Sequence, residues 1–351
     1  MDFNLEDLPG IGPTKAKRLK ENGVTSPLDF IIRGAREISR LTDITPATTA
    51  KMIKQIREKL AESGAPIQVD SIETLRELKK TQKRYSVDVD EIDKATRGGF
   101  ETQSVYEVYG GEGAGKTQLT FSITSKVIAK KESVWFIDCE GTFDEERLEE
   151  ICLNRDVEYD TDLIKYNLVT DSEDMLELIN TKGLEHVVVG SVRVIIIDGL
   201  VGLFRMLYHG RGELAERQDV LEQILIKLRN LSVYGNCCVI LTNQVMSNPD
   251  PFGQREKAVG GHVLGHSVKY IFAIRKGLKN NRVLSRIKSP KDPQGDFSFF
   301  LNEEGVSSEE TVKKRNAKKK LENQLSSSEG IKDTSLLLEC LVQNVGLNTS
   351  W

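Results

Sequence analysis

Hydrophobic and polar residues repeat with two different periods along the chain. From about residue 5 to residue 60, apolar positions recur at helical spacing between short turns. From residue 104 onward, apolar runs of strand length alternate with amphipathic helical stretches, and the runs cover residues 104–109, 134–138, 192–198 and 237–242. Alternation of this kind is typical of a parallel, doubly wound sheet. The pattern therefore predicts a small all-α domain followed by an α/β core with a mostly parallel sheet.

Breaks in the pattern set the boundaries of these parts. The polar stretch over residues 62–66, ESGAP, has the composition of a linker. Beyond residue 306 a lysine-rich helical pattern and a second, apolar one form a tail, which is either a solvated appendage or a docking peptide or DNA-binding arm. We therefore predict four parts, over residues 1–61, 62–84, 85–306 and 307–351.

The first turn of the helical domain, residues 8–13 (LPGIGP), has the signature of a helix-hairpin-helix motif. Gly10 and Gly12 permit a tight turn and leave N–H groups directed outward at the start of the next helix, where a DNA phosphate can bind. A second, weaker copy covers residues 44–47. A capped surface helix after a Pro-Gly turn is the alternative interpretation. Positive charge beside the first copy comes from Lys15, Lys17 and Arg18.

The composition restricts how the protein can bind nucleic acid. Of 351 residues 38% are hydrophobic and 29% are charged, and the net charge is only −4, so any DNA contact must come from particular loops and motifs. The N-terminus lacks a signal-peptide pattern, and no stretch approaches the roughly 20 apolar residues of a membrane helix. We expect a cytoplasmic protein without membrane association, whose thiols are reduced at Cys139, Cys152, Cys237, Cys238 and Cys340.

The first strand of the core is followed at once by a P-loop sequence of the form GxxxxGK[ST]. Its glycine-rich backbone can wrap phosphates, and the helix that begins near Lys116 offers its positive end. Lys116 is expected to reach the terminal phosphates and Thr117 to ligate Mg²⁺. The sequence thus predicts ATP and Mg²⁺ as cofactors, held by Gly110, Gly111, Glu112, Gly113, Ala114, Gly115, Lys116 and Thr117.

Other strand ends supply candidate residues for ATP hydrolysis. Asp198 ends an apolar strand, where it either ligates Mg²⁺ or only terminates the strand. Glu140 lies just beyond another strand and is our candidate general base, with a solvated loop acid as the alternative. Asn243 and Gln244 end a fourth strand, and their amides could sense the γ-phosphate. Because the carboxyl ends of parallel strands meet at one edge of a sheet, we expect these groups to converge on one site.

These features together resemble the archaeal RadA recombinases, which have a RecA-like P-loop ATPase core. The resemblance covers about residues 5–306 and implies a DNA repair protein that coats single-stranded DNA as an ATP-dependent filament, hydrolyses ATP in a DNA-dependent manner and exchanges strands between homologous DNAs. It also implies contacts with double-stranded DNA, self-association into a helical filament or ring, and a place on the nucleoid. The motifs that carry it are Glu101-Thr102-Gln103, Gly115-Lys116-Thr117-Gln118, residues 212–218 (GELAERQ), Thr242-Asn243-Gln244-Val245 and Gly260-Gly261-His262.

The resemblance assigns DNA contacts to two loops. The first covers residues 204–212, and its arginines, with one on the following helix, would contact the phosphates of a bound strand. The second covers residues 246–259, a long segment rich in Asn, Pro, Asp and Gly. Without the family pattern these side chains would be ordinary surface residues. The residues concerned are Arg205, Arg211 and Arg217 for the first loop, and Phe252, Arg255 and Lys257 for the second.

Further nucleotide contacts are implied in the same way. Arg147 resembles the family arginine that packs on adenine, with a helix-surface ion pair as the alternative. His262 could couple the γ-phosphate to the DNA loops, or be a structural hydrogen-bonding residue. Gln118 completes the P-loop motif. Lys288 precedes a segment that ends at Pro293 and resembles the cap that a neighbouring protomer places over ATP.

The chain departs from the family pattern at three places. The segment that joins protomers, usually Phe-x-x-Ala, here has Ile72 and Leu75, so the interface cannot be the usual one. Gly199 follows Asp198 where the family commonly has serine. Lys288 stands where the family commonly has an acid, and its ammonium group either serves as a built-in cation at a neighbour's γ-phosphate or points to solvent.

Two other functions fit parts of the sequence. A recombinase paralogue that binds ATP and DNA as a mediator, without strand-exchange activity, would account for Ile72, Leu75 and the tail. A ring-shaped helicase would share the ATPase core. The helix-hairpin-helix domain and the two-loop arrangement favour a recombinase over the helicase, and the intact DNA loops favour it over the mediator.

Overall fold

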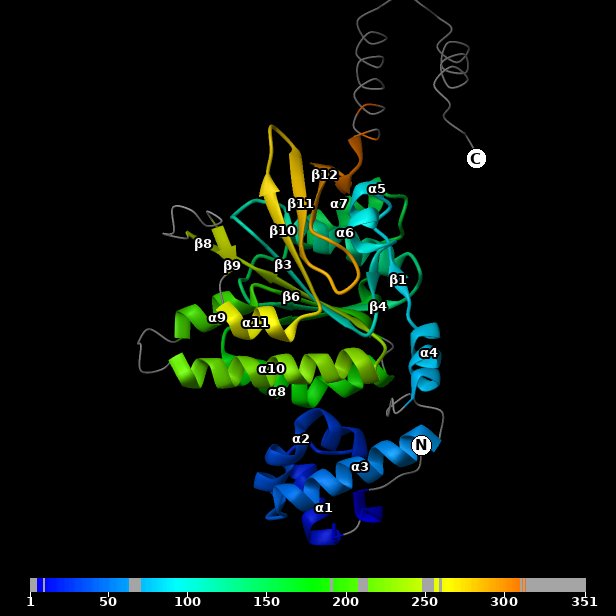
Figure 1. Ribbon diagram of the computed structural model, residues 1–351, viewed down its shortest axis with the longest axis vertical. Coiled ribbons are helices and arrows are strands. Elements are labelled where there is room, and N and C mark those ends of the chain that lie inside the picture. The colour runs from blue at the N-terminus through cyan, green and yellow to red at the C-terminus, as the bar shows by residue number, and fades with distance from the viewer. Residues whose placement is uncertain are drawn as a thin grey trace, which may run out of the picture. The chain divides into compact units, whose positions relative to one another are not determined.

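The computed structural model has an all-α N-terminal part and an α/β core with a mostly parallel sheet, which confirms the predicted fold class (Figure 1). It describes residues 5–8, 10–62, 71–189, 192–207, 214–247, 256–258, 261–309, 311 and 313. The chain divides into two compact units, Met1–Ser307 and Ser308–Trp351. Nearly all of the second unit lies outside the described residues, so the interpretations of the tail stay predictions.

The N-terminal part packs around a single apolar cluster that includes Leu19, Phe30 and Ile56. Each of its α-helices begins with a proline, whose missing N–H costs no hydrogen bond at that position. The backbone N–H of Ser26 donates to Asp29 Oδ2 at 2.7 Å, which closes a capping box at the second helix. The helices are η1 (Leu5–Asp7), α1 (Pro13–Glu21), α2 (Pro27–Thr42) and α3 (Pro46–Glu62).

The segment predicted as a linker contains a helix. α4 (Ile72–Lys80) begins after Ser71, whose hydroxyl accepts a hydrogen bond of 3.1 Å from the backbone N–H of Thr74. Residues 63–70 lie outside the described residues. Ser71 is thus the N-cap residue of a helix inside the joining segment. The predicted boundaries between the parts stay predictions.

One nine-stranded sheet forms the core, in the order β13-β12-β11-β10-β3-β7-β6-β4-β5. The pairs from β10 through β3, β7, β6 and β4 to β5 are parallel, and β10 to β13 pair antiparallel. The central strands are buried on both faces, which explains their continuous apolar runs and confirms the four predicted strands. The strands are β3 (Ser104–Gly110), β4 (Ser133–Asp138), β5 (Ile164–Leu168), β6 (Val192–Asp198), β7 (Cys238–Asn243), β10 (Tyr270–Lys276), β11 (Asn281–Lys288), β12 (Gly295–Asn302) and β13 (Gly305–Ser307).

Helices cover both faces of this sheet (Figure 1). α5 (Asp90–Thr96), α6 (Lys116–Ile128) and α7 (Glu145–Asn154) pack on one face. The other face holds α8 (Ser172–Leu184), α9 (Leu200–Leu207), α10 (Leu214–Tyr234) and α11 (Gly261–Ser267). The remaining elements are the pair β1 (Arg84–Tyr85) and β2 (Phe100–Glu101), η2 (Thr161–Leu163), the π-helical turn η3 (Glu185–Val189), and the pair β8 (Val245–Ser247) and β9 (Glu256–Ala258).

A buried ion pair joins the N-terminal helices to the core. Lys227 on α10 is only 3% exposed, and its Nζ donates to Glu37 Oε2 on α2 and, at 2.9 Å, to Asn180 Oδ1 on α8. Burial lowers the pKa of Lys227, and the Glu37 carboxylate opposes this shift. Loss of Glu37 would leave the ammonium group buried without its counter-charge, which is costly.

Two further predictions concern the whole chain. The cysteines that the structure describes, Cys139, Cys152, Cys237 and Cys238, are free and buried, as predicted, and Cys340 lies outside the described residues. Within the described ranges, no helix combines the length and the apolar character needed to cross a membrane.

Candidate nucleotide-binding site

The P-loop connects β3 to α6 and requires glycine at several positions. Gly113 and Gly115 have positive φ angles of 62° and 106°, which residues with side chains rarely adopt. A Cβ atom on Gly110 would collide with a backbone carbonyl of β10, and one on Gly115 would lie 2.8 Å from Leu301 Cδ1. On Gly111, however, a Cβ would meet nothing within 4 Å. The loop is therefore a tight backbone ring with an open side, which fits the phosphates of a nucleotide.

Lys116 lies over this loop at the start of α6. Its Nζ donates to the carbonyl oxygens of Gly110 at 2.9 Å and of Gly111 at 3.2 Å. Burial lowers the pKa of the ammonium group, whereas the charges of Glu140 and Asp198 raise it. A lysine held in this way can exchange the two carbonyls for phosphate oxygens.

Thr117 and Asp198 lie side by side next to the loop. Thr117 Oγ1 donates to Asp198 Oδ2 at 2.9 Å, and the Thr242 hydroxyl donates to the other carboxylate oxygen. Burial raises the pKa of Asp198. A hydroxyl beside a carboxylate is a donor set that suits Mg²⁺ held jointly with nucleotide phosphates. Among the described residues, no group of three or more His, Cys, Asp and Glu side chains could hold a metal ion by itself.

Glu140 and Gln244 meet at the same strand ends. Gln244 Nε2 donates to Glu140 Oε1 at 2.8 Å. Burial raises the pKa of Glu140, and the charge of Asp198 raises it further. The Asp138 carboxylate accepts the backbone N–H of Glu140 at 3.0 Å and thereby fixes the start of the loop. An accessible carboxylate with a raised pKa, next to a P-loop, suits a general base.

Asn243, which we expected to face the same crevice, is buried against β3. Its Nδ2 donates at 2.8 Å to Oε1 of Glu107, a buried residue of β3. This hydrogen bond holds the amide donor of Asn243 on a buried carboxylate. Its contact with the γ-phosphate stays a prediction.

Arg147 reaches from α7 to the P-loop helix. Its Nε and Nη2 both donate to Gln118 Oε1 at 2.9 Å, and Nη2 also donates to the carbonyl of Asn302 at 2.6 Å. Asp144 caps α7 by accepting the backbone N–H of Arg147 at 2.9 Å. The guanidinium group is thus held beside the residue that follows Thr117. Its contact with adenine stays a prediction.

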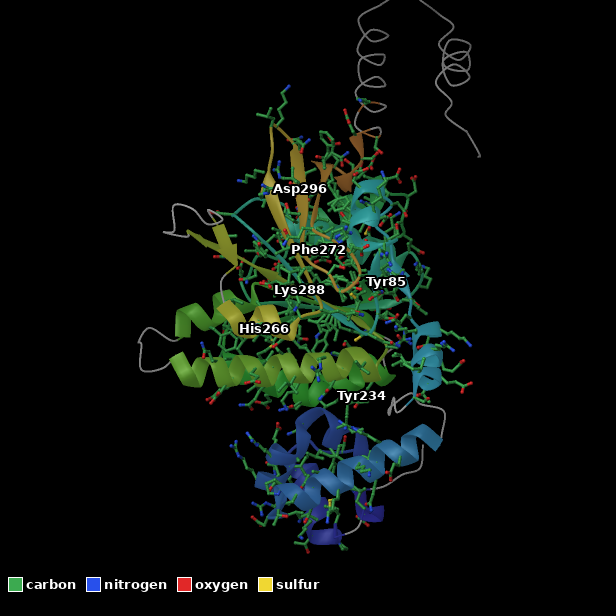
Figure 2. The ribbon with its side chains drawn as sticks, viewed as in Figure 1. Tyr85, Tyr234, His266, Phe272, Lys288 and Asp296 are labelled. Carbon is green, nitrogen blue, oxygen red and sulfur yellow. The ribbon has the colours of Figure 1, made fainter. Side chains whose placement is uncertain are left out.

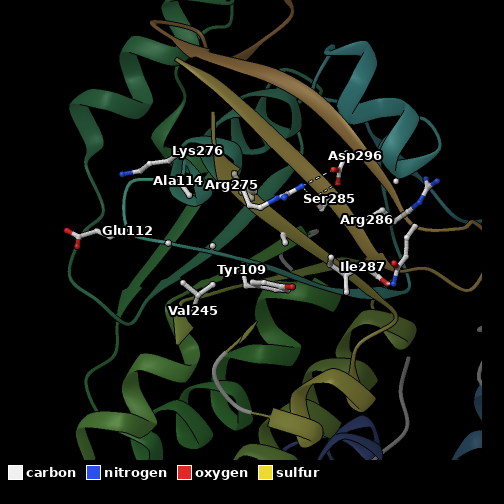
Figure 3. Close-up of a pocket in the computed structure, with 16 residues that line it drawn as sticks. Tyr109, Glu112, Ala114, Val245, Arg275, Lys276, Ser285, Arg286, Ile287 and Asp296 are labelled. Atoms are coloured by element: carbon white, nitrogen blue, oxygen red, sulfur yellow. Dashed lines mark hydrogen bonds and ion pairs between the residues drawn. The ribbon is translucent and has the colours of Figure 1, made fainter. Parts of the chain in front are cut away.

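A cavity of about 830 Å³ opens beside the P-loop (Figure 3). Two of its walls are the loop itself and the paired strands β10 and β11, and β12 closes a third side. Its lining residues include Tyr109, Gly110, Gly111, Glu112, Ala114, Val245, Arg275, Lys276, Ser285 and Asp296.

Two basic residues of the β10–β11 hairpin lie against the P-loop, and neither was predicted from the sequence. Lys276 Nζ lies 3.1 Å from the position that a Cβ atom on Gly113 would occupy. Arg282 Nε donates to the carbonyl oxygen of Ala114 at 3.0 Å. Their place follows from the antiparallel pairing of β10 with β11, in which Lys276 is paired with Arg282. The only signal in the sequence was a cluster of basic residues flanking a turn.

Lys288 caps a helix of its own chain. Its Nζ donates to the carbonyl oxygens of Gly265 at 2.7 Å and of Val268 at 2.8 Å, at the C-terminal end of α11. Figure 2 shows Lys288 close to α11 and to His266. The interpretation that Lys288 points to solvent is therefore wrong. Its role at a neighbour's nucleotide stays a prediction.

The cap segment that follows Lys288 is held by ion pairs and a backbone contact. Lys291 Nζ lies 2.9 Å from Glu101 Oε2, and Arg97 Nε lies 2.9 Å from an oxygen of Asp292. The carbonyl oxygen of Pro293 accepts a hydrogen bond of 2.8 Å from Nε of Arg286 on β11. The segment therefore has a defined shape in the protomer, and its contact with ATP stays a prediction.

The residues assigned to DNA fall into two groups. Gly10 has a φ angle of 84°, and Gly12 immediately precedes α1 with nothing within 4 Å of the position of a Cβ. Arg205 lies in α9, Arg217 in α10, Lys257 in β9 and His262 in α11, but their side chains lie outside the described part of the structure. Arg211, Phe252 and Arg255 lie outside the described residues altogether. All these assignments stay predictions.

The residues assigned to the protomer interface lie in the first turn of α4. Ile72 is 66% exposed, and Leu75 is partly buried. An exposed isoleucine directly after a helix cap is available to another protomer, which is what the prediction requires. The contact itself stays a prediction.

Comparison with known proteins identifies the relatives of this chain. Residues 79–309 match the Rad51 family, and residues 3–58 match the SAM-like helix-hairpin-helix tandem. The chain belongs to the Rad51 family. A DNA repair and recombination protein RadA from Cenarchaeum symbiosum is 35% identical over 316 residues, which are 87% of this chain and 79% of that protein. The protein of the same name from Methanococcus voltae is 32% identical over 329 residues, which are 87% of this chain and 99% of that protein. The family resemblance and the helix-hairpin-helix domain are thereby confirmed.

Proposed function

We propose that this chain is a recombinase of DNA repair, which forms an ATP-dependent filament on single-stranded DNA, hydrolyses ATP in a DNA-dependent manner and exchanges strands between homologous DNAs. The observation that carries the proposal is the convergence of Lys116, Thr117, Glu140, Asp198 and Gln244 on one P-loop in a Rad51-family core. A role on chromosomal DNA implies a place in the cytoplasm, at the nucleoid.

The side chains at the P-loop fit ATP with Mg²⁺. When bound, ATP would supply the phosphoanhydride bond to be hydrolysed, and Mg²⁺ would help to neutralise the phosphate charge. Lys116 binds the terminal phosphates in place of the two loop carbonyls. Thr117 and Asp198 would hold the metal ion through their oxygen atoms. Glu140 orients and deprotonates the attacking water, and Gln244 holds the carboxylate in place.

DNA contacts come from the backbone of the helix-hairpin-helix domain and from the two loops. The open space at Gly12, at the start of α1, leaves room for a phosphate. The arginines of the first loop add contacts to the backbone of the bound strand, which need no particular base sequence. We therefore expect binding that is sequence-independent and steeply dependent on salt.

Self-association completes the site. Ile72 and Leu75 insert into a neighbouring protomer, and the cap segment from Lys288 to Pro293 covers the nucleotide of the next subunit. The exposure of Ile72 supports this arrangement. The departure from the Phe-x-x-Ala pattern favours a second candidate function, a mediator that binds ATP and DNA without exchanging strands.

One experiment separates these functions. The purified chain is incubated with ATP, Mg²⁺ and homologous single- and double-stranded DNA, and joint molecules are measured. We expect joint molecules, helical filaments in electron micrographs on single-stranded DNA, and the loss of both joint molecules and hydrolysis in Lys116→Ala. DNA binding without joint molecules would support the mediator, and rings in place of filaments would support a helicase.

A second measurement tests the base. Glu140→Gln keeps the shape of the side chain but cannot accept a proton at neutral pH, so turnover should fall by roughly 10²–10⁴-fold while ATP binding is retained. Turnover at the level of the natural protein would assign the proton transfer to another group.

A further inference from the structure

The Glu140 side chain lies directly on the backbone of Gly199. Gly199 follows Asp198 at the end of β6 and has a φ angle of 86°. A Cβ atom at this position would lie 2.6 Å from Glu140 Cδ and 2.7 Å from Glu140 Oε1, far closer than real Cβ contacts. One turn later, a Cβ on Gly202 would lie 3.4 Å from the same carboxylate oxygen. The two glycines thus form a surface without side chains, which we call the Glu140 seat.

The seat cannot move aside easily, because hydrogen bonds fix its backbone. The N–H of Gly199 donates to Thr242 Oγ1 at 2.9 Å, and the Thr242 hydroxyl in turn donates to Asp198. The carbonyl of Gly199 accepts the N–H of Gly202 at 2.9 Å, which starts α9. A side chain at residue 199 would therefore have to displace Glu140 rather than the backbone.

We propose that Gly199 is a positioning residue, which holds the Glu140 carboxylate against Gln244 and toward the P-loop. The inference rests on the proposed function, in which Glu140 is the general base.

The seat also connects Glu140 to both segments that lead toward the proposed DNA loops. Gly199 directly precedes α9 and Gly202 lies in its first turn, and this helix leads into the first loop. Gln244 directly precedes β8, which leads into the second loop. Both segments therefore contact the same carboxylate, one through its backbone and one through a hydrogen bond of 2.8 Å. Movement of either segment on DNA binding would change how Glu140 is held.

The experiment compares Gly199→Ala with a matched control, Gly98→Ala. Gly98 has a φ angle of 92°, but a Cβ atom there would meet nothing within 4 Å, so Gly98→Ala introduces the same kind of backbone strain without the contact. DNA-stimulated turnover, ATP affinity and thermal unfolding are measured for both. We expect turnover of Gly199→Ala to fall by at least ~10-fold with unchanged ATP affinity, since the position of the base affects only the chemical step. Turnover of Gly98→Ala should equal that of the natural protein.

The pH profile supplies a readout that a purely structural role would not change. Desolvation at the seat and the charge of Asp198 raise the pKa of Glu140, so displacement away from the seat lowers it. Because the base must be ionised to act, the acid limb of the turnover profile should move to lower pH in Gly199→Ala. An unchanged acid limb together with unchanged turnover would overturn the proposal, as would an equal loss of turnover in Gly98→Ala.

A double-mutant cycle separates the seat from the assignment of the base. In a Glu140→Ala background there is nothing for the new Cβ to displace, so Gly199→Ala should lower the unfolding temperature less there than in the natural protein. Equal effects in both backgrounds would refute the seat, whatever Glu140 does. Natural turnover in Glu140→Ala would instead refute Glu140 as the base, and the cycle would still test the seat.

Discussion

Thr117 Oγ1 donates a hydrogen bond of 2.9 Å to Asp198 Oδ2, although 81 residues separate them in the chain. The contact joins the first turn of the P-loop helix to the end of β6, two strands away from β3 in the sheet. Both groups are oxygen donors, and the carboxylate is buried. The proposed Mg²⁺ site requires this arrangement, with the metal ion in place of the hydrogen bond between the two groups.

The first prediction concerns this pair. Asp198→Asn keeps the shape of the side chain but removes its charge, so the Mg²⁺ concentration for half-maximal ATPase activity should rise by more than ~10-fold. The measurement is a titration of DNA-stimulated ATPase activity with Mg²⁺. Glu158→Gln, which changes an exposed carboxylate paired with Lys131, is the control and should leave the titration unchanged. An identical Mg²⁺ requirement in Asp198→Asn would remove this residue from the metal site.

The P-loop and its acidic partners could be predicted because residue type and position along the chain define them. A glycine-rich loop between a strand and a helix has one common use, and the carboxyl ends of parallel strands bring Asp198 and Glu140 to the same edge. The partner of the Asn243 amide could not be predicted, because only the pairing of β7 with β3 brings Asn243 beside Glu107.

Contacts that depend on distant registers could not be predicted. Arg282 donates a hydrogen bond to the carbonyl oxygen of Ala114, although 168 residues separate them in the chain. The pairing of β10 with both β3 and β11 brings the two residues together. Lys288 was expected to face a neighbour or solvent. Nothing in the sequence around it indicates that its ammonium group can bind the carbonyl oxygens at the end of α11. The Glu140 seat depends on the positive φ angle of Gly199. Glycine permits such an angle but does not require it, so the sequence alone does not predict the seat.

The second prediction concerns stability at low pH and the buried carboxylate Glu101. Its side chain is 1% exposed and accepts contacts from three cations, Arg84 at 2.6 Å, Lys269 at 2.8 Å and Lys291 at 2.9 Å. Burial alone would raise its pKa, but hydrogen bonds from Lys269, Tyr270 and Lys291 outweigh burial and lower the pKa to about 2. A carboxylate with a lowered pKa stabilises the fold above its unfolded pKa of about 4.3, and this contribution is lost as the pH falls toward 2.

We therefore expect the free energy of unfolding to fall by roughly 2 kcal/mol between pH 4.5 and pH 2 through this group, as measured by denaturant titration. In Glu101→Gln this part of the pH dependence should disappear, and the protein should be less stable at pH 7 because three cations lose their counter-charge. A slope in Glu101→Gln equal to that of the natural protein would assign the acid sensitivity to other carboxylates.

The third prediction concerns Ile72 and self-association. Ile72 is 66% exposed in the protomer, so Ile72→Asp should leave the unfolding temperature unchanged. If this side chain inserts into a neighbour, the variant should fail to form filaments on single-stranded DNA with ATP, because a buried unpaired carboxylate is costly at an interface. The measurement is electron microscopy combined with light scattering after size-exclusion chromatography. Leu153→Asp, at a leucine of α7 that is 64% exposed, is the matched control and should assemble normally.

The last prediction concerns Lys288, whose ammonium group satisfies two carbonyl oxygens at the C-terminal end of α11. A cation at this end of a helix is favourable, by up to ~2 kcal/mol where it is partly buried. Lys288→Met should therefore lower the free energy of unfolding by about 1–2 kcal/mol, and Lys288→Asp by more, since it places a negative charge at the negative end of the helix. Chemical denaturation of the three proteins measures this order.

The same variants test whether Lys288 also replaces a monovalent cation at a neighbour's nucleotide. Because the tethered ammonium group would supply the positive charge at the γ-phosphate, the natural protein should have nearly equal DNA-stimulated ATPase activity in sodium and in potassium at matched ionic strength. Lys288→Asp should become dependent on potassium, whereas Lys288→Met should lose activity in both salts. Strong potassium dependence of the natural protein would leave Lys288 with the structural role alone, as the residue that fixes the end of α11 against the sheet.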